Sequence, residues 1–218
     1  MKNVVILISG RGSNMRSIVE DASATGSPYR VAAVISNQPS AEGLTWAKAQ
    51  GLVTESLDHR SFPSRDAFDA ALAGLIDRFS PDIVVLAGFM RILGENFVQR
   101  YEGRMLNIHP SLLPAFPGMH THRQALQYGS KLHGCTVHFV TANLDHGPVI
   151  VQAAVPVLPD DDENTLAERV LAEEHRIYPL ALRWLAEGRL VVRDGVVRVK
   201  QAEDWKAQGA TQTLVFPA

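Results

Sequence analysis

Four short apolar runs, separated by helical patterns, constrain the fold of this chain more than any other feature. They are rich in β-branched residues and lie at residues 4–8, 31–35, 83–86 and 105–108. Each run is apolar enough for a strand that is buried on both faces, as strands of parallel sheets usually are. Strands that alternate with helices are typical of βαβ units. The sequence therefore predicts an α/β fold with a parallel sheet.

The clearest helix is predicted just before the third run. Ser64 can cap its start, Arg65 lies exposed in its first turn, and Pro81 follows its end. Its apolar stripe has helical spacing and consists of Phe68, Ala71, Leu72, Leu75, Ile76 and Phe79.

The pattern changes in the C-terminal third of the chain. Residues 136–140 alternate in polarity, residues 145–148 form a turn sequence, and residues 149–157 are again apolar. This succession predicts a hairpin at the edge of the sheet.

A long helix is expected to follow, from about Thr165 to Glu187. Pro179 should kink or break it, because proline lacks a backbone donor and clashes with the preceding turn. A terminal hairpin is expected around residues 193–196, and the tail after Lys200 is polar enough to be loosely held.

Composition excludes several classes of protein. The 218 residues suit one domain with a full core, and a formal net charge of -2 is too small to gather nucleic acid. The single cysteine, Cys135, cannot form an internal disulfide, so a reducing compartment fits best. The chain lacks a signal-peptide cleavage site and any run near the roughly 20 apolar residues of a membrane helix. We expect a cytoplasmic protein, and the sequence leaves its oligomeric state open.

A glycine-containing turn follows the first predicted strand. It reads Ser-Gly-Arg-Gly-Ser-Asn at residues 9–14 and opens a helix, where free N–H groups and the positive helix end favour a phosphate. A dinucleotide site fits less well, because Met15 replaces the third glycine of the fingerprint and the second strand ends without an acidic residue. The alternative is a tight strand-to-helix turn without a ligand.

Asn107 and His109 are two residues apart at the end of the fourth predicted strand, so they point to the same side. An amide donor and a charged imidazole together suit attack on an acyl or formyl carbon. A buried histidine beside a loop-capping asparagine is the structural alternative.

Asp145 is the only carboxylate between Glu102 and Asp160 and is therefore the natural partner of His109. A carboxylate beside an imidazole favours its charged form. An ordinary turn aspartate that bonds its own backbone is the alternative.

Six of the eight histidines lie between His109 and His146, but their spacing does not suit a metal. Cys135 is expected to be a core residue rather than a nucleophile. Residues 88–93 leave a strand at the sheet edge that also carries the glycine turn, where a flat ring could pack; ordinary core packing is the alternative.

Taken in order, these motifs resemble those of the glycinamide ribonucleotide formyltransferases, and the resemblance covers nearly the whole chain. The motifs are residues 12–14, 87–93, 107–114, 116–125, 133–140, and Asp145 with Gly147 and Pro148. The resemblance implies a doubly wound, mostly parallel sheet of the Rossmann-like formyltransferase type, with an antiparallel C-terminal part. It implies one formyltransferase domain over residues 1–218. An acceptor-phosphate half at about 1–100, a folate and catalytic half at about 101–190, and a terminal hairpin and tail at 190–218 are expected within it.

The resemblance also implies substrates and site residues. The formyl group of 10-formyltetrahydrofolate, a co-substrate, would pass to the amine of 5'-phosphoribosylglycinamide in purine biosynthesis, without a metal. The catalytic residues would be Asn107, His109 and Asp145. The acceptor's phosphate and ribose would bind Gly12, Ser13, Asn14 and Glu174, and the folate would bind Arg65, Met90, Arg91, Ile92, Leu93 and Asn107.

Related formyl-group enzymes share the Asn-x-His core. A formyltetrahydrofolate hydrolase, or a formyltransferase for another amine such as the methionyl-tRNA enzymes, is therefore the alternative function. Their additional domains are not seen here, and residues 116–118 read Phe-Pro-Gly where the tRNA enzymes carry Arg-Gly. Arg11 falls at a variable position, and the chain after Leu190 matches the family poorly, so the roles of both stay open.

Overall fold

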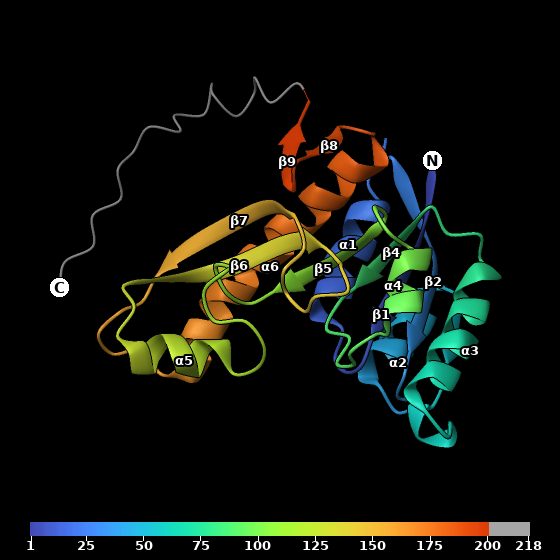
Figure 1. The fold of residues 1–218 in the computed structure, drawn as a ribbon, viewed down its shortest axis with the longest axis horizontal. Helices are drawn as coiled ribbons and strands as arrows, with labels where there is room; N and C mark the ends of the chain where they lie inside the picture. The colour runs from blue at the N-terminus through green and yellow to red at the C-terminus, as the bar shows by residue number, and fades with distance from the viewer. Residues whose placement is uncertain (201–218) are drawn as a thin grey trace.

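A seven-stranded sheet forms the centre of the molecule (Figure 1) in the computed structural model, which describes residues 1–200. The strand order is β3-β2-β1-β4-β5-β6-β7. The strands are β1 (Lys2–Ile8), β2 (Tyr29–Ser36), β3 (Thr54–Ser56), β4 (Ile83–Leu86), β5 (Met105–His109), β6 (Leu132–Phe139) and β7 (Val149–Pro156). Strands β1 to β5 pair in parallel, and β6 and β7 join antiparallel. The predicted mostly parallel sheet with an antiparallel C-terminal part is confirmed.

Helices cover both faces of this sheet. They are α1 (Ser13–Ala22), α2 (Glu42–Ala49), α3 (Arg65–Asp77), α4 (Glu95–Arg100), α5 (Thr121–Tyr128) and α6 (Glu163–Ala186), with a 3-10 turn at His59–Ser61. In Figure 1, α3 lies at one end of the molecule, and α5 and β7 lie at the other.

The two faces bury separate cores because successive strand residues point to opposite sides. In β1, Val4, Ile6 and Ile8 pack with α1 and α6, whereas Val5 and Leu7 pack with α3 and α4. The sheet is therefore doubly wound, as expected. None of the helices within residues 1–200 is long and apolar enough to cross a membrane.

The long helix differs from its prediction. It begins at Glu163, two residues early, because Asp162 and Thr165 form a capping box at its start. It also continues through Pro179 to Ala186, so the helix is not broken there, while the predicted kink stays a prediction. Pro179 is buried together with Tyr178, Ala181 and Leu182, and such tertiary burial can sustain a helix despite the lost donor.

The smaller predicted features are found as well. The side chain of Ser64 accepts a hydrogen bond from the Ala67 amide and so caps α3. The terminal hairpin consists of β8 (Leu190–Arg193) and β9 (Val196–Val199), and Arg193 pairs with Val196. The expected loose tail after Lys200 lies outside the described residues.

Candidate active site

The candidate site residues gather at the carboxyl ends of the central strands. In the order β3-β2-β1-β4-β5, connections leave β1 and β4 in opposite directions along the sheet. Open α/β sheets bind ligands at such a switch point. The glycine turn follows β1, residues 87–94 follow β4, and Asn107 and His109 end β5.

The turn before α1 requires glycine at position 12. Gly12 has φ +72°, and a Cβ there would lie 2.9 Å from the Met15 Cε atom and 3.3 Å from the Gly43 Cα atom. No side chain caps the first turn of α1. The turn therefore presents backbone N–H groups at a positive helix end, as an anion site needs.

Asn14 and Glu174 meet behind this turn. The Asn14 Nδ2 atom donates to Glu174 Oε2 at 2.7 Å, and both residues are buried. Burial raises the pKa of Glu174, and the hydrogen bond from Asn14 opposes that shift. The Oδ1 atom of Asn14 is also buried and has no hydrogen-bond partner within residues 1–200. Two buried side chains with acceptor atoms thus lie behind the turn.

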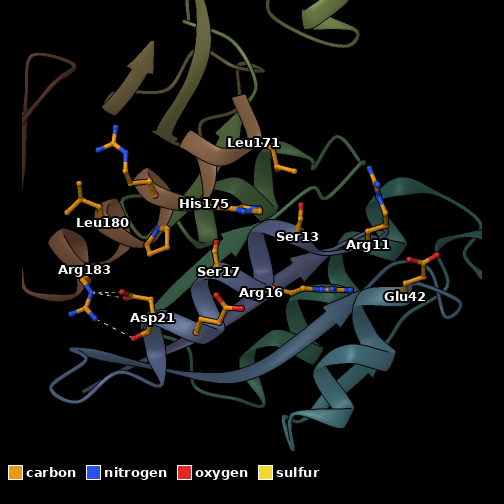
Figure 2. A pocket seen from close by; sticks show the side chains of 13 residues that line it. Arg11, Ser13, Arg16, Ser17, Asp21, Glu42, Leu171, His175, Leu180 and Arg183 are labelled. Atoms are coloured by element: carbon orange, nitrogen blue, oxygen red, sulfur yellow. Dashed lines mark hydrogen bonds and ion pairs between the residues drawn. The ribbon is translucent and has the colours of Figure 1, made fainter. Parts of the chain in front are cut away.

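A groove of about 850 Å³ runs from this turn between α1 and α6 (Figure 2). Arg183 closes its far end through an ion pair with Asp21 at 2.8 Å. The lining residues are Arg11, Ser13, Arg16, Ser17, Glu20, Asp21, Glu42, Leu171, His175, Arg176, Pro179, Leu180 and Arg183.

Within residues 1–200, three basic side chains near the turn end of the groove, those of Arg11, Arg16 and His175, form no ion pair. Arg11 and Arg16 form no ion pair within residues 1–200, and the Arg16 guanidinium lies over the Trp46 ring at 5.2 Å. The Nε2 atom of His175 is buried without a hydrogen-bond partner, and its ring faces the same hollow as Ser13 (Figure 2). Burial lowers the pKa of His175, and the charge of Glu20 opposes this shift.

A second cavity, of about 90 Å³, lies beside the end of β5. Its wall is largely apolar and carries a few polar groups, and it consists of Leu86, Phe89, Arg91, Ile92, Leu93, Val98, Asn107, His138, Val140, Thr141, Ala142, Asn143, Leu144 and Asp145. The structure therefore brings together Arg91, Ile92, Leu93 and Asn107, four of the residues expected to bind folate.

The other two expected folate residues lie elsewhere. Met90 is largely exposed, and its backbone amide donates to the Ser9 Oγ atom at 2.8 Å. Arg65 is exposed at the start of α3 and lines a neighbouring cavity with Asp69 and Gly94.

Asn107 is held by a histidine that the sequence analysis did not single out. The two residues are paired across β5 and β6, and Asn107 Nδ2 lies 3.3 Å from His138 Nε2. An amide nitrogen only donates, so His138 Nε2 accepts while Nδ1–H donates to the Phe139 carbonyl at 2.9 Å. Burial lowers the pKa of His138, which fits this neutral tautomer. The second N–H of Asn107 stays available to a ligand. The alternation of residues 136–140 was the signal that could have found His138.

His109 lies next to Asp145, as its position in the sequence suggested. The His109 Nδ1 atom is 3.6 Å from Asp145 Oδ1, and both side chains are almost fully buried. His109 Nε2–H donates to the Phe116 carbonyl at 3.0 Å, and Asp145 Oδ2 accepts from the Gly118 amide at 2.9 Å. The pair is thus fixed by the loop that follows β5.

The turn that carries Asp145 is strained and tightly packed. Asp145 has φ +55°, a left-handed conformation that aspartate tolerates better than most residues. A Cβ at Gly147 would lie 1.7 Å from the Phe139 carbonyl oxygen, so only glycine fits there. These constraints keep the carboxylate against His109 rather than in solvent.

His133 and Cys135 lie in the packed interior nearby. His133 Nε2 lies 3.2 Å from His122 Nδ1, and burial lowers the pKa of His133 to about 4. Burial raises the pKa of Cys135 to about 12 and leaves its thiol inert, so the predicted core role is confirmed.

The doubly wound fold, with Asn107, His109 and Asp145 close together at the carboxyl ends of its strands, defines a class: an α/β protein with its candidate active site at the switch point of the sheet. Comparison with known proteins narrows this class. A family model for formyl transferases matches residues 2–182. The phosphoribosylglycinamide formyltransferase of Escherichia coli (strain K12) is 52% identical over 192 residues, which cover 88% of this chain and 91% of that protein. The chain belongs to the formyl transferase family, among its phosphoribosylglycinamide formyltransferases.

Other relatives agree with this assignment. The human trifunctional purine biosynthetic protein adenosine-3 is 46% identical over 185 residues, which cover 85% of this chain and 18% of that protein. The crystal structure of glycinamide ribonucleotide transformylase 1 from Symbiobacterium toebii superposes with a TM-score of 0.90 at 50% identity, covering 92% of this chain and 95% of that one. The structure of the phosphoribosylglycinamide formyltransferase from Coxiella burnetii in complex with CHES superposes with a TM-score of 0.86 at 46% identity. The match covers 91% of this chain and 93% of that one.

Proposed function

We propose that this enzyme transfers the formyl group of 10-formyltetrahydrofolate to the amine of 5'-phosphoribosylglycinamide. The products are formylglycinamide ribonucleotide and tetrahydrofolate, in purine biosynthesis. The observation that carries the proposal is the buried His109–Asp145 pair, 3.6 Å apart, in which His109 shares the end of β5 with Asn107.

The acceptor binds at the glycine turn. Its phosphate accepts hydrogen bonds from the N–H groups at the start of α1, where Ser13 and Arg11 line the groove and the His175 ring faces it. Its ribose hydroxyls donate to the acceptor atoms of Asn14 and Glu174. Arg11 then adds positive charge to the phosphate site.

The formylfolate binds at the second cavity. Phe89, Ile92, Leu93 and Leu144 supply apolar surface for a flat ring. The Nε atom of half-buried Arg91, which has no hydrogen-bond partner within residues 1–200, is a donor for the polar edge of that ring. The cavity is small, so the remainder of the folate lies over the exposed side chains of Met90 and Ile92. This arrangement places the formyl carbon near Asn107.

The chemistry follows from these positions. The glycinamide nitrogen attacks the formyl carbon, a C–N bond forms, and the carbonyl oxygen becomes an oxyanion. The second N–H of Asn107 donates to this oxyanion, and the imidazole of His109, with Asp145 beside it, adds electrostatic stabilisation. When the carbonyl re-forms, the bond from carbon to the folate N10 breaks. A proton then passes from the acceptor nitrogen to N10 through water, so atoms and charge balance.

A panel of acceptors tests the proposal. The purified enzyme and 10-formyltetrahydrofolate are mixed with phosphoribosylglycinamide, with charged initiator tRNA or with water alone, and the loss of formylfolate is followed by absorbance. We expect fast loss only with phosphoribosylglycinamide. Fast loss with tRNA or in water alone would instead support a different amine acceptor or a hydrolase.

A further inference from the structure

The backbone amide of Gly94 donates a hydrogen bond to the Asp69 Oδ2 atom at 2.7 Å. Gly94 ends the segment 87–94, whereas Asp69 belongs to α3 on the other side of that segment. We infer that Asp69 is a positioning residue, which fixes the far end of the segment 87–94 and thereby the folate cavity. This inference rests on the proposed function, since it assigns the cavity beside Asn107 to folate.

The segment 87–94 is held at its two ends. At its start, the Ser9 amide donates to the Gly88 carbonyl at 3.1 Å, and the Met90 amide donates to Ser9 Oγ at 2.8 Å. At its end, the Gly94 amide donates to Asp69, a bond that we call the tether, and the Gly94 carbonyl accepts from the Val98 amide of α4 at 3.0 Å. Between these anchors, residues 91–93 make no hydrogen bond within the part of the chain that the structure describes. These three residues of the cavity wall are therefore positioned by the anchors and by packing.

The Asp69 side chain is largely removed from solvent where it meets Gly94. It is only 6% exposed, and its Oδ1 atom is buried with no hydrogen-bond partner among residues 1–200. Burial raises the pKa of Asp69, and the Gly94 amide and the charges of Arg65 and Arg91 oppose that shift. Burial of a carboxylate is unfavourable unless hydrogen bonds and nearby opposite charges compensate for the lost hydration.

Gly94 fits the tether closely. A Cβ at this position would lie 3.0 Å from Asp69 Oδ2, tighter than ordinary van der Waals contact. Gly94 has φ -72°, so the backbone itself would accept alanine and only the approach to Asp69 would change. The tether can therefore be disturbed from either partner.

The contact lies close to both arginines that were expected to bind folate. Asp69 and Arg65 line one cavity, and Arg91, whose guanidinium lies 5.1 Å from the centre of the Phe68 ring, lines the folate cavity. Loss of the tether would release Arg91, Ile92 and Leu93 from the folate side while leaving the glycine turn and Glu174 untouched. The effect should be confined to one of the two substrates.

The test compares Asp69→Ala, Asp69→Asn and Gly94→Ala with the wild-type enzyme. A hydrogen bond to a charged group contributes enough to change affinity about tenfold or more. For Asp69→Ala we expect the KM for 10-formyltetrahydrofolate to rise by about that factor, with the KM for phosphoribosylglycinamide within about twofold of wild type. Asp69→Asn keeps an oxygen acceptor for the Gly94 amide and should recover most of the folate affinity. Gly94→Ala should raise the folate KM in the same direction, and it serves as the second variant if Asp69→Ala does not fold.

Asp66→Ala is the matched control, because Asp66 is exposed in the same helix and lines the same cavity without a hydrogen bond to the segment. It should leave both KM values unchanged. Three outcomes would contradict the positioning role of Asp69. They are an unchanged folate KM in folded Asp69→Ala, an equal rise of both KM values, or an Asp69→Asn enzyme as impaired as Asp69→Ala. A wild-type enzyme that transfers no formyl group to phosphoribosylglycinamide would instead overturn the proposed function.

Discussion

The His109 imidazole and the Asp145 carboxylate face each other across 3.6 Å, with 7% and 5% of their side chains exposed. They come from the end of β5 and from the turn between β6 and β7. Two groups that can carry opposite charges are thus enclosed together beside Asn107. Within a low-dielectric interior, such a pair acts more strongly than it would in water.

Replacement of Asp145 by asparagine should lower turnover by about two to four orders of magnitude, the range attributed to acid–base or oxyanion groups. The fold should persist, because the amide oxygen can still accept from Gly118. Without the carboxylate, the His109 imidazole loses the negative charge that lies 3.6 Å from its Nδ1 atom. Turnover of the variant and of the wild-type enzyme, with circular dichroism as the folding control, checks this expectation. A folded variant with near-normal turnover would make Asp145 an ordinary turn residue.

Replacement of His138 by alanine should lower turnover about tenfold to a hundredfold, because Asn107 loses the acceptor that orients its amide. His146→Ala, in the exposed turn nearby, is the matched control and should change little. Burial lowers the pKa of His138, so it stays neutral at neutral pH and loses its acceptor nitrogen only in more acidic solution. Steady-state turnover of both variants is the measurement. Equal losses of turnover in His138→Ala and His146→Ala would contradict a role for His138 in the site.

Replacement of Glu174 by glutamine should weaken acceptor binding but stabilise the fold. Burial raises the pKa of Glu174 above that of an unfolded glutamate, so the folded protein carries a penalty that develops as pH rises through this raised pKa. The neutral amide removes that penalty, and about 1 kcal/mol would raise the melting temperature by about 2–4 °C at pH 7. Thermal melting at pH 4 and pH 7 should show the gain mainly at the higher pH. A lower melting temperature at both values would contradict this account of the carboxylate.

Arg91→Ala should raise the KM for formylfolate more than Arg65→Ala does. Arg91 lines the cavity beside Asn107, whereas Arg65 lies in the neighbouring one. The KM for the acceptor should stay nearly constant in both variants, which serves as the internal control. A larger effect of Arg65→Ala on this KM would indicate that the charged end of the folate lies nearer to α3.

The sequence predicted the sheet well, because its strands are buried on both faces and stand out as apolar runs. The Ser64 cap and both hairpins were also readable, since each depends on local residues only. The continuation of α6 through Pro179 could not be predicted from the sequence. It depends on the burial of Tyr178 and Leu182, which only the folded structure shows. The short strand β3 was missed as well, since its three residues Thr-Glu-Ser carry no apolar pattern.

The candidate site was only partly predictable. Asn107 and His109 could be placed on one strand end, and the scarcity of carboxylates singled out Asp145. His138 was missed because its role depends on the register of β6 against β5, which no single strand reveals. The tether from Asp69 to Gly94 joins residues 25 positions apart and likewise requires the folded structure.

The central claim is that Asn107, His109 and Asp145 move a formyl group from folate to the glycinamide amine. The most direct measurement supplies 10-formyltetrahydrofolate with a ¹³C-labelled formyl group together with phosphoribosylglycinamide, and follows the label by NMR for the wild-type enzyme and for His109→Asn. We predict that the wild-type enzyme moves the label into the formamide of the ribonucleotide, one per folate consumed, and that the variant does so far more slowly while remaining folded. Label recovered as formate, or equal transfer by both proteins, would contradict the account.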